Sequence, residues 1–318
     1  MNKRKQIISE NEISRMVEWN LSGYPQKVLL EGRRKELPVV ICLHGGPGTP
    51  IPFNAGCRGL FPELTNRFIM VYWDQLGCGI NNRPMKDIFS LERMVEMTRE
   101  LVLEVRKLFP HNPICLLSIS WGTVLSALAA EKLGDELTGV VASGQVVKDL
   151  IFNPHTAKLL ESPEIPVKQR EKLRGIRKET AQAPDFQRIM SSLQKYTVGY
   201  MNPGDQAKSL PLILGMLRSP DYSLRDFMAI VKNGYTGLDT PIRTLLDVNL
   251  EAQLQNVKVP YRIFQGQTDG ITPAALVKEV VEKAGTPLLS WEMIPDSGHF
   301  FGPRVMEALT AALEALTN

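Results

Sequence analysis

Short apolar segments alternate with longer amphipathic segments along most of this 318-residue chain. The short segments are rich in Val, Ile, Tyr and Phe, which is typical of strands buried on both faces of a parallel sheet. In the longer segments apolar residues recur every three or four positions, as in helices that bury one face. The alternation predicts an α/β fold, with a mostly parallel central sheet flanked by helices. The predicted strands are residues 26–31, 38–43, 67–73, 113–118, 137–143, 259–265 and 288–294, and the predicted helices are residues 91–109, 121–132, 273–284 and 303–316.

The alternation stops between residues 149 and 250 and resumes at Val259. The interrupting block is helical in pattern and is broken by six prolines: Pro154, Pro163, Pro166, Pro203, Pro211 and Pro220. We therefore expect residues 149–250 to form a helical cap inserted after the sixth strand of the sheet. Residues 1–148 and 251–318 would form the core, with residues 1–16 as an extra N-terminal helix.

Composition narrows the expected partners. Lys and Arg exceed Asp and Glu by 37 − 34 = 3, an excess too small to indicate nucleic acid or an anionic membrane. There is no signal-peptide core and no apolar run of about 18 residues, so a soluble cytoplasmic protein is expected. The cysteines lack Cys-x-x-Cys spacing, and we expect reduced thiols, no metal and no cofactor. These cysteines are Cys42, Cys57, Cys78 and Cys115.

The stretch LLSISWGTVL, residues 116–125, lies where a predicted strand passes into a predicted helix. A serine at such a turn, with a small residue two positions before it and glycine two positions after, is typical of a nucleophile elbow. Both flanking positions must be small because strand and helix nearly touch there. Ser118 and Gly122 meet this requirement around Ser120, although the first position more usually holds glycine.

Two alternatives for this stretch are weaker. If Ser118 were the nucleophile, Leu116 would occupy a position that needs a small side chain. Ser120 is alternatively an ordinary cap of the helix that begins at Trp121. The residues that follow favour the nucleophile, since they supply the groups that a reactive serine needs.

A serine nucleophile needs a general base, most often histidine. The chain has four histidines, at positions 44, 111, 155 and 299. His111 lies in a turn at the opposite end of the sheet, and His155 lies in the expected cap. His299 follows the last predicted strand, at the same sheet edge as Ser120, and is the predicted base.

A base of this kind also needs a carboxylate that orients the imidazole. Asp269 lies in the turn after residues 259–265, again at the carboxyl edge of the sheet. The order Ser120, Asp269, His299 is that of α/β-hydrolases. The competing acids are Asp296, only three residues before His299, and Asp149, after the sixth predicted strand. The position of Asp269 in a turn at the strand end favours Asp269.

The stretch LHGGPGTP follows the strand at residues 38–43. Glycines in such a loop expose backbone N–H groups, which an oxyanion hole requires. We expect Gly46, with Gly45 as the alternative, to supply one N–H group. Trp121 would supply the other. His44 would support the loop.

The motifs HGGPG at residues 44–48, WDQLGCG at residues 73–79 and SWG at residues 120–122 resemble the proline iminopeptidase branch of the α/β-hydrolase superfamily. The resemblance implies an α/β-hydrolase fold with a helical cap and a serine hydrolase that needs no cofactor. It also implies that acidic cap residues bind a substrate's amino terminus in true aminopeptidases. The sequence departs from the branch at Ser118 and Leu76, and the cap contains no tryptophan.

The function predicted from these residues is hydrolysis of an amide or ester bond through an acyl-enzyme on Ser120. An aminopeptidase or amidase acting on a small molecule or short peptide is the leading interpretation. An esterase, lactonase or carbon–carbon hydrolase is the alternative, and a ligand-binding protein that retains the triad is a third. The cap carboxylates that would be candidates for an amine site are Glu161, Glu164, Asp185, Asp205, Asp221, Asp226 and Asp239.

Overall fold

The computed structural model describes residues 3–54, 56–205, 209–232, 235, 237–300 and 302–318. Its strands are β1 (Ile13–Leu21), β2 (Tyr24–Gly32), β3 (Val39–Leu43), β4 (Ile69–Tyr72), β5 (Ile114–Ile119), β6 (Gly139–Ser143), β7 (Tyr261–Gly266) and β8 (Leu289–Ile294). Its α-helices are α1 (Lys3–Glu10), α2 (Pro62–Thr65), α3 (Leu91–Leu108), α4 (Trp121–Leu133), α5 (Pro154–Leu160), α6 (Val167–Arg174), α7 (Ala183–Tyr196), α8 (Ser209–Leu217), α9 (Leu224–Lys232), α10 (Asp239–Asp247), α11 (Glu251–Gln255), α12 (Ala274–Ala284) and α13 (Pro303–Thr317), and short 3₁₀ helices are η1 (Gly79–Asn81), η2 (Gly134–Glu136) and η3 (Pro203–Asp205).

The eight strands form one sheet in the order β1-β2-β4-β3-β5-β6-β7-β8. β1 pairs with β2 and β2 pairs with β4 in antiparallel fashion, and every pairing from β4 to β8 is parallel. The carboxyl ends of β5, β7 and β8 therefore lie at one edge of the sheet, and loops that follow these strands meet there.

Helices cover both faces of the sheet because successive strand residues point to opposite sides. In β3, Val39, Ile41 and Leu43 pack in one apolar cluster, which includes residues of α3, α4 and α12. Val40 and Cys42 pack in the other, which includes residues of α2 and α13. Every residue of β3 is buried, as the continuous apolar run predicted.

The predicted α/β-hydrolase fold is confirmed, and all seven predicted strands are present. The N-terminal prediction was wrong beyond Glu10, because α1 ends there and β1 begins at Ile13. β1 was missed since it is a half-exposed edge strand with charged residues such as Arg15 and Glu18, so it lacks the long apolar run of a buried strand. Met1 and Asn2, also part of that prediction, lie outside the described residues.

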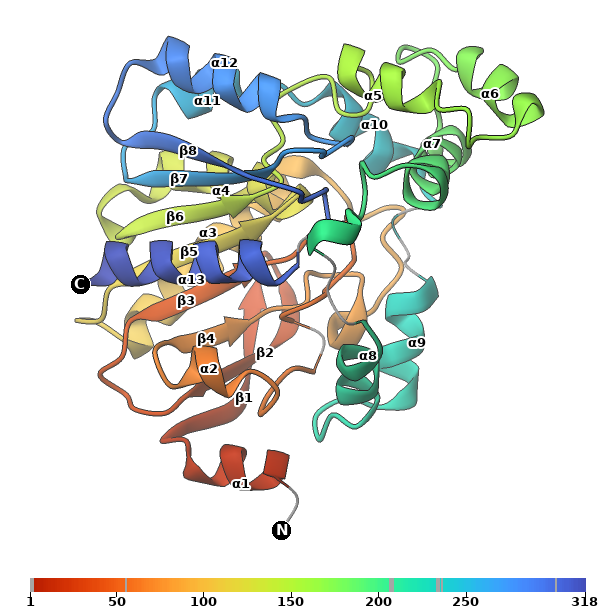
Figure 1. Ribbon diagram of the computed structural model, residues 1–318. Coiled ribbons are helices and arrows are strands. Elements are labelled where there is room, and N and C mark those ends of the chain that lie inside the picture. Colours follow the sequence, from red (N-terminus) through yellow and green to blue (C-terminus); the bar gives the residue numbers. More distant parts are fainter. Residues whose placement is uncertain (1–2, 55, 206–208, 233–234, 236, 301) are drawn as a thin grey trace.

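Residues 149–250 carry α5 to α10 between β6 and β7, and in their described part they contain no strand. Figure 1 shows these helices together at one end of the sheet, with α5, α6, α7 and α10 in one group and α8 and α9 in another. A small apolar cluster around Met216 and Ile230 packs α8 and α9 against Ile51, in the loop after β3.

Candidate active site

Ser120 lies on the sharp turn between β5 and α4. Its backbone has a φ of 50° and a ψ of −119°, a conformation that residues with side chains rarely adopt. The amide of Ser120 donates to the carbonyl oxygen of Ser143 at 2.9 Å. A Cβ added to Gly122 would lie 2.0 Å from the carbonyl oxygen of Leu43. This contact explains why the turn needs glycine two residues after the serine.

Ser120, His299 and Asp269 form one hydrogen-bonded series at the carboxyl edge of the sheet. His299 Nε2 lies 2.9 Å from Ser120 Oγ, and His299 Nδ1 lies 2.8 Å from Asp269 Oδ2. With the proton on Nδ1 donated to the carboxylate, Nε2 is free to accept the serine proton. The side chains of His299 and Asp269 are only 9% and 0% exposed. The structure thus brings together the three residues that the sequence singled out for the triad.

The Asp269 carboxylate is held by donors from its own turn and from β7. Oδ1 accepts the N–H groups of Ile271 and Thr272 at 2.8 and 2.9 Å. Oδ2 accepts the Thr272 hydroxyl at 2.8 Å and the Gln265 side-chain amide at 2.8 Å. Donors of this kind stabilise the ionised carboxylate and fix its orientation toward His299. Sequence reasoning missed Gln265 and Thr272, although both lie in the same stretch as Asp269.

The glycine loop after β3 lies beside the serine. A Cβ on Gly45 would come 3.3 Å from the Cβ of Ser120, and both Gly45 and Gly46 line the pocket that contains Ser120. Gly46 has a φ of +119°, which is strained for any side chain, and a Cβ there would lie 2.5 Å from the amide nitrogen of Gly48. Trp121 is the first residue of α4, so its N–H has no partner within the helix.

His44 supports this loop as a neutral imidazole. Its Nε2 accepts the backbone N–H of Gln75 at 2.9 Å, so its proton resides on Nδ1, which lies 2.9 Å from the carbonyl oxygen of Gly45. Burial lowers the pKa of His44 to about 4. The Gln75 side chain donates to the carbonyl oxygen of His44 and accepts the indole N–H of Trp121. Gln75 thereby joins the glycine loop to the elbow, a role that the sequence reasoning did not assign.

The Ser118 hydroxyl belongs to a buried polar network beneath the elbow. Ser126 donates to Ser118 at 2.9 Å and lies 3.1 Å from the Tyr261 hydroxyl. Tyr261 donates to the side-chain oxygen of Gln145 at 2.8 Å, and the backbone N–H of Gln145 donates to Gln265 at 3.0 Å. The network therefore runs from the elbow to the same Gln265 that donates to Asp269.

The competing residues lie elsewhere. Asp296 is exposed and pairs with Arg304 at 3.4 Å, and Asp149 pairs with Lys178 at 2.6 Å. The four cysteines are free and buried, and burial raises the pKa of the Cys115 thiol to about 12. Among the described residues, no group of three His, Cys, Asp or Glu side chains is placed to hold a metal ion. No helix in the same part of the chain is long and apolar enough to cross a membrane.

A cavity of about 320 Å³ opens beside Ser120. Its walls come from the glycine loop, from the end of β5, from α7 and from the loops around Tyr200 and His299. The residues that line it are Gly45, Gly46, Thr49, Ile51, Ile119, Ser120, Phe186, Gln187, Met190, Ser191, Gln194, Tyr200, His299 and Phe300.

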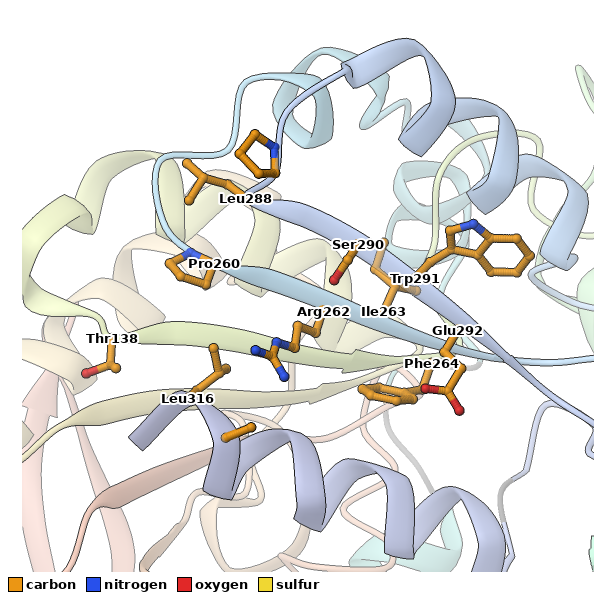
Figure 2. Close-up of a pocket in the computed structure, with 12 residues that line it drawn as sticks. Thr138, Pro260, Arg262, Ile263, Phe264, Leu288, Ser290, Trp291, Glu292 and Leu316 are labelled. Carbon is orange, nitrogen blue, oxygen red and sulfur yellow. The ribbon is translucent and has the colours of Figure 1, made fainter. Parts of the chain in front are cut away.

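A second, larger pocket of about 640 Å³ lies over β7 and β8. Figure 2 shows the residues that line it, among them Arg262, Glu292 and Leu316. Neither Ser120 nor His299 is among the described residues that line it. Of these two pockets, the smaller is therefore the one that Ser120 and His299 line.

A mostly parallel eight-stranded sheet with serine, acid and histidine at its carboxyl edge defines a hydrolase of the α/β class. The chain belongs to the alpha/beta hydrolase fold family, whose model matches residues 38–302. It is similar to the probable aminopeptidase YbaC of Bacillus subtilis, with 24% identity over 307 residues, 92% of this chain and 93% of that protein. It is also similar to the proline iminopeptidase of Thermoplasma volcanium, with 24% identity over 263 residues, 80% of this chain and 83% of that protein. The crystal structure of VinJ shares the fold, with a TM-score of 0.67 and 20% identity over 96% of this chain and 98% of that chain. The chain is thus an α/β hydrolase that is similar to proline iminopeptidases, and the resemblance drawn from the sequence motifs is confirmed.

Proposed function

We propose that this enzyme is a serine hydrolase that cleaves an amide or ester bond through an acyl-enzyme on Ser120. The observation that carries the proposal is the series of short contacts from Ser120 Oγ to His299 Nε2 and from His299 Nδ1 to Asp269. A hydroxyl is a weak nucleophile until a base takes its proton, and this series supplies the base and the carboxylate that orients it.

In the first half of the reaction His299 takes the Ser120 proton as Oγ forms a bond to the substrate carbonyl carbon. The bond from that carbon to the leaving group then breaks, and His299 returns the proton to the departing amine or alcohol. In the second half water attacks the acyl-enzyme. His299 takes a proton from the water and gives it to Ser120, and the carboxylic acid is released.

The charge that develops on the carbonyl oxygen would be held by the N–H groups of Gly46 and Trp121. Two observations support this assignment: Gly46 lies on the pocket wall, and the N–H at the start of α4 has no partner within the helix. Gly45 would allow the close approach of the loop, and His44 would keep it in place. We further propose that residues 149–250 act as a cap on a core made of residues 1–148 and 251–318, because α7 forms one wall of the pocket.

Two substrate classes have specific support. The resemblance to proline iminopeptidases and the relative described as a probable aminopeptidase favour cleavage of an amide next to an amino terminus. The absence of charged side chains among the described pocket residues favours an ester or amide of a neutral acid.

A fluorophosphonate probe tests the mechanism. We expect the folded protein to gain the mass of one phosphonyl group, measured by intact-protein mass spectrometry, and Ser120→Ala to gain none. His299→Gln should slow labelling by a factor of roughly 100 to 10,000, as loss of a general base does. A folded wild-type protein that is not labelled would contradict the proposal. Amino-acid arylamides and aryl esters assayed side by side then separate amide from ester cleavage.

A further inference from the structure

His299 is the one acidic or basic side chain among the described residues that line the pocket beside Ser120. Among the described residues that line it there is no Asp, Glu, Lys or Arg. Its apolar walls are Ile51, Ile119, Phe186, Met190 and Phe300. Such walls bind an apolar acyl group by removing its surface from water.

One face of α7 supplies the polar part of this wall. Gln187, Ser191 and Gln194 recur at steps of four and three along the helix, so they lie on the same face, and all three line the cavity. Their amide and hydroxyl groups are neutral. A neutral donor or acceptor matches a carbonyl, amide or hydroxyl group of a substrate, but it does not neutralise a charge.

Six of the seven cap carboxylates that could have bound an amine have other partners. Asp221 pairs with Arg58, and the Asp205 carboxylate accepts the Ser297 hydroxyl and the Arg304 backbone N–H. Asp239 accepts the backbone N–H of Ala183 at 2.8 Å. Asp185, Glu161 and Asp226 likewise bind groups of the cap itself. None of the seven candidates, Glu164 included, lines the pocket.

The acid of the triad does not fill this role either. The Asp269 side chain is 0% exposed, and its carboxylate already accepts hydrogen bonds from His299, Gln265 and Thr272. Consider a substrate with an ammonium group on the carbon next to its carbonyl carbon. This group would lose its hydrating water in the pocket without gaining an anionic partner, which is unfavourable.

We infer that the pocket selects uncharged apolar acyl groups, so the substrates are esters or amides of neutral carboxylic acids, N-acylated amino acids included. The inference rests on the proposed acyl-enzyme function and names its substrate class. This substrate class differs from the one that the family resemblance implies, which is substrates with a free amino terminus. A negative charge introduced at position 194 would change the selection, because Gln194 lines the pocket on the polar face of α7.

Two phosphonate diphenyl esters derived from leucine test the inference, one with a free amine and one with an N-acetylated amine. Ser120 Oγ attacks phosphorus and phenoxide leaves, so the labelling rate reports acyl-group selection without requiring turnover. Near pH 6.5 we expect the N-acetylated probe to label the wild-type protein at least 10-fold faster. As the pH rises through about 8, where an α-amino group loses its charge, the labelling rate of the free-amine probe should approach that of the N-acetylated probe.

Gln194→Glu places a carboxylate in the pocket. Near pH 6.5 it should lower several-fold the ratio of the labelling rate with the N-acetylated probe to that with the free-amine probe. Lys195→Gln is the matched control, since it makes the same change in net charge at the next position of α7 and does not line the pocket. It should leave the ratio unchanged. Equal ratios in these two variants would contradict the placement of the acyl group beside Gln194.

The outcomes separate this inference from the proposed function. Faster labelling by the free-amine probe near pH 6.5 would overturn the inference, although the serine mechanism would stand. Failure of both leucine probes in a protein that the simple fluorophosphonate labels would also overturn it, because the pocket would then reject the whole acyl class. If the simple fluorophosphonate does not label the folded protein, the proposed function is contradicted, and so is the inference that rests on it.

Discussion

The carbonyl oxygen of Gly199 accepts the backbone N–H of His299 at 3.2 Å. Gly199 follows α7, within residues 149–250, whereas His299 follows β8. The same carbonyl oxygen accepts the N–H of Gly270 at 2.9 Å. The backbone carbonyl oxygen of the neighbouring Tyr200 accepts the N–H of Phe300 at 2.7 Å. One short segment after α7 therefore holds both the loop that carries the acid and the loop that carries the histidine.

Gly199→Ala should displace these loops. The added Cβ would lie 2.7 Å from Leu159 Cδ1 and 3.1 Å from the Cα of Gly270. We expect the labelling rate of Ser120 to fall about 10-fold or more, because small displacements of catalytic groups are costly. Gly175→Ala, also within residues 149–250, is the control, since its nearest neighbour would be 3.6 Å away. Equal rates in the two variants would show that the segment does not position the histidine.

Gln265→Met should weaken the orientation of Asp269 and leave the pocket intact. The substitution keeps the length of the side chain but removes the amide, which donates to Asp269 Oδ2 at 2.8 Å and accepts the Gln145 N–H at 3.0 Å. We expect kcat to fall roughly 10-fold with KM unchanged, as for loss of one hydrogen bond to a charged group in the transition state. Steady-state kinetics with a cleaved substrate measure this. Gln267→Met, at the exposed glutamine two residues further on, should leave kcat as it is, and a rise in KM alone for Gln265→Met would contradict the assignment.

Ser118→Gly should affect stability more than activity. The variant removes one of the hydrogen-bond partners of the Ser126 hydroxyl and adds backbone freedom to β5. We expect the free energy of unfolding in urea to fall by about 1 to 2 kcal/mol. The labelling rate should stay within a few fold, because glycine keeps the elbow closed. A large loss of labelling in a folded variant would mean that the Ser118 hydroxyl has a direct part in the reaction.

Asp74→Asn should change how stability depends on pH. Asp74 follows β4, accepts the Tyr222 hydroxyl and the Ile80 N–H, and burial raises the pKa of its carboxyl group to about 7. Because the unfolded carboxyl ionises near pH 4, the folded state holds an extra proton between these values, and the stability that Asp74 contributes falls as the pH rises through 7.

The wild-type protein should therefore lose about 2 kcal/mol more than Asp74→Asn between pH 5 and pH 8. Urea unfolding of both proteins at both pH values measures the difference. Glu31, whose pKa burial also raises to about 7, is present in both proteins and drops out of the comparison. Parallel pH dependences would show that Asp74 does not hold a proton in the folded state.

The α/β-hydrolase fold was predictable because each buried strand or helix requires a local pattern of apolar residues in the sequence. The elbow was predictable for a related reason: the contact of Gly122 with Leu43 requires a small side chain at a fixed distance from Ser120. β1 escaped prediction since an edge strand with one half-exposed face does not produce the long apolar run on which the other predictions depended.

The sequence by itself determined the order of the strands and helices, the elbow and the residues available as base and acid, because each depends on neighbours within one element or turn. Only the tertiary structure decided which side chains meet. The hold of Gly199 on His299, the position of Gln265 beside Asp269 and the uncharged wall of the pocket all join segments far apart in the chain. The sequence positions of the cap carboxylates do not show whether these side chains face the pocket. In the structure six of the seven have partners within the cap or at its contacts with the core, and none of the seven lines the pocket.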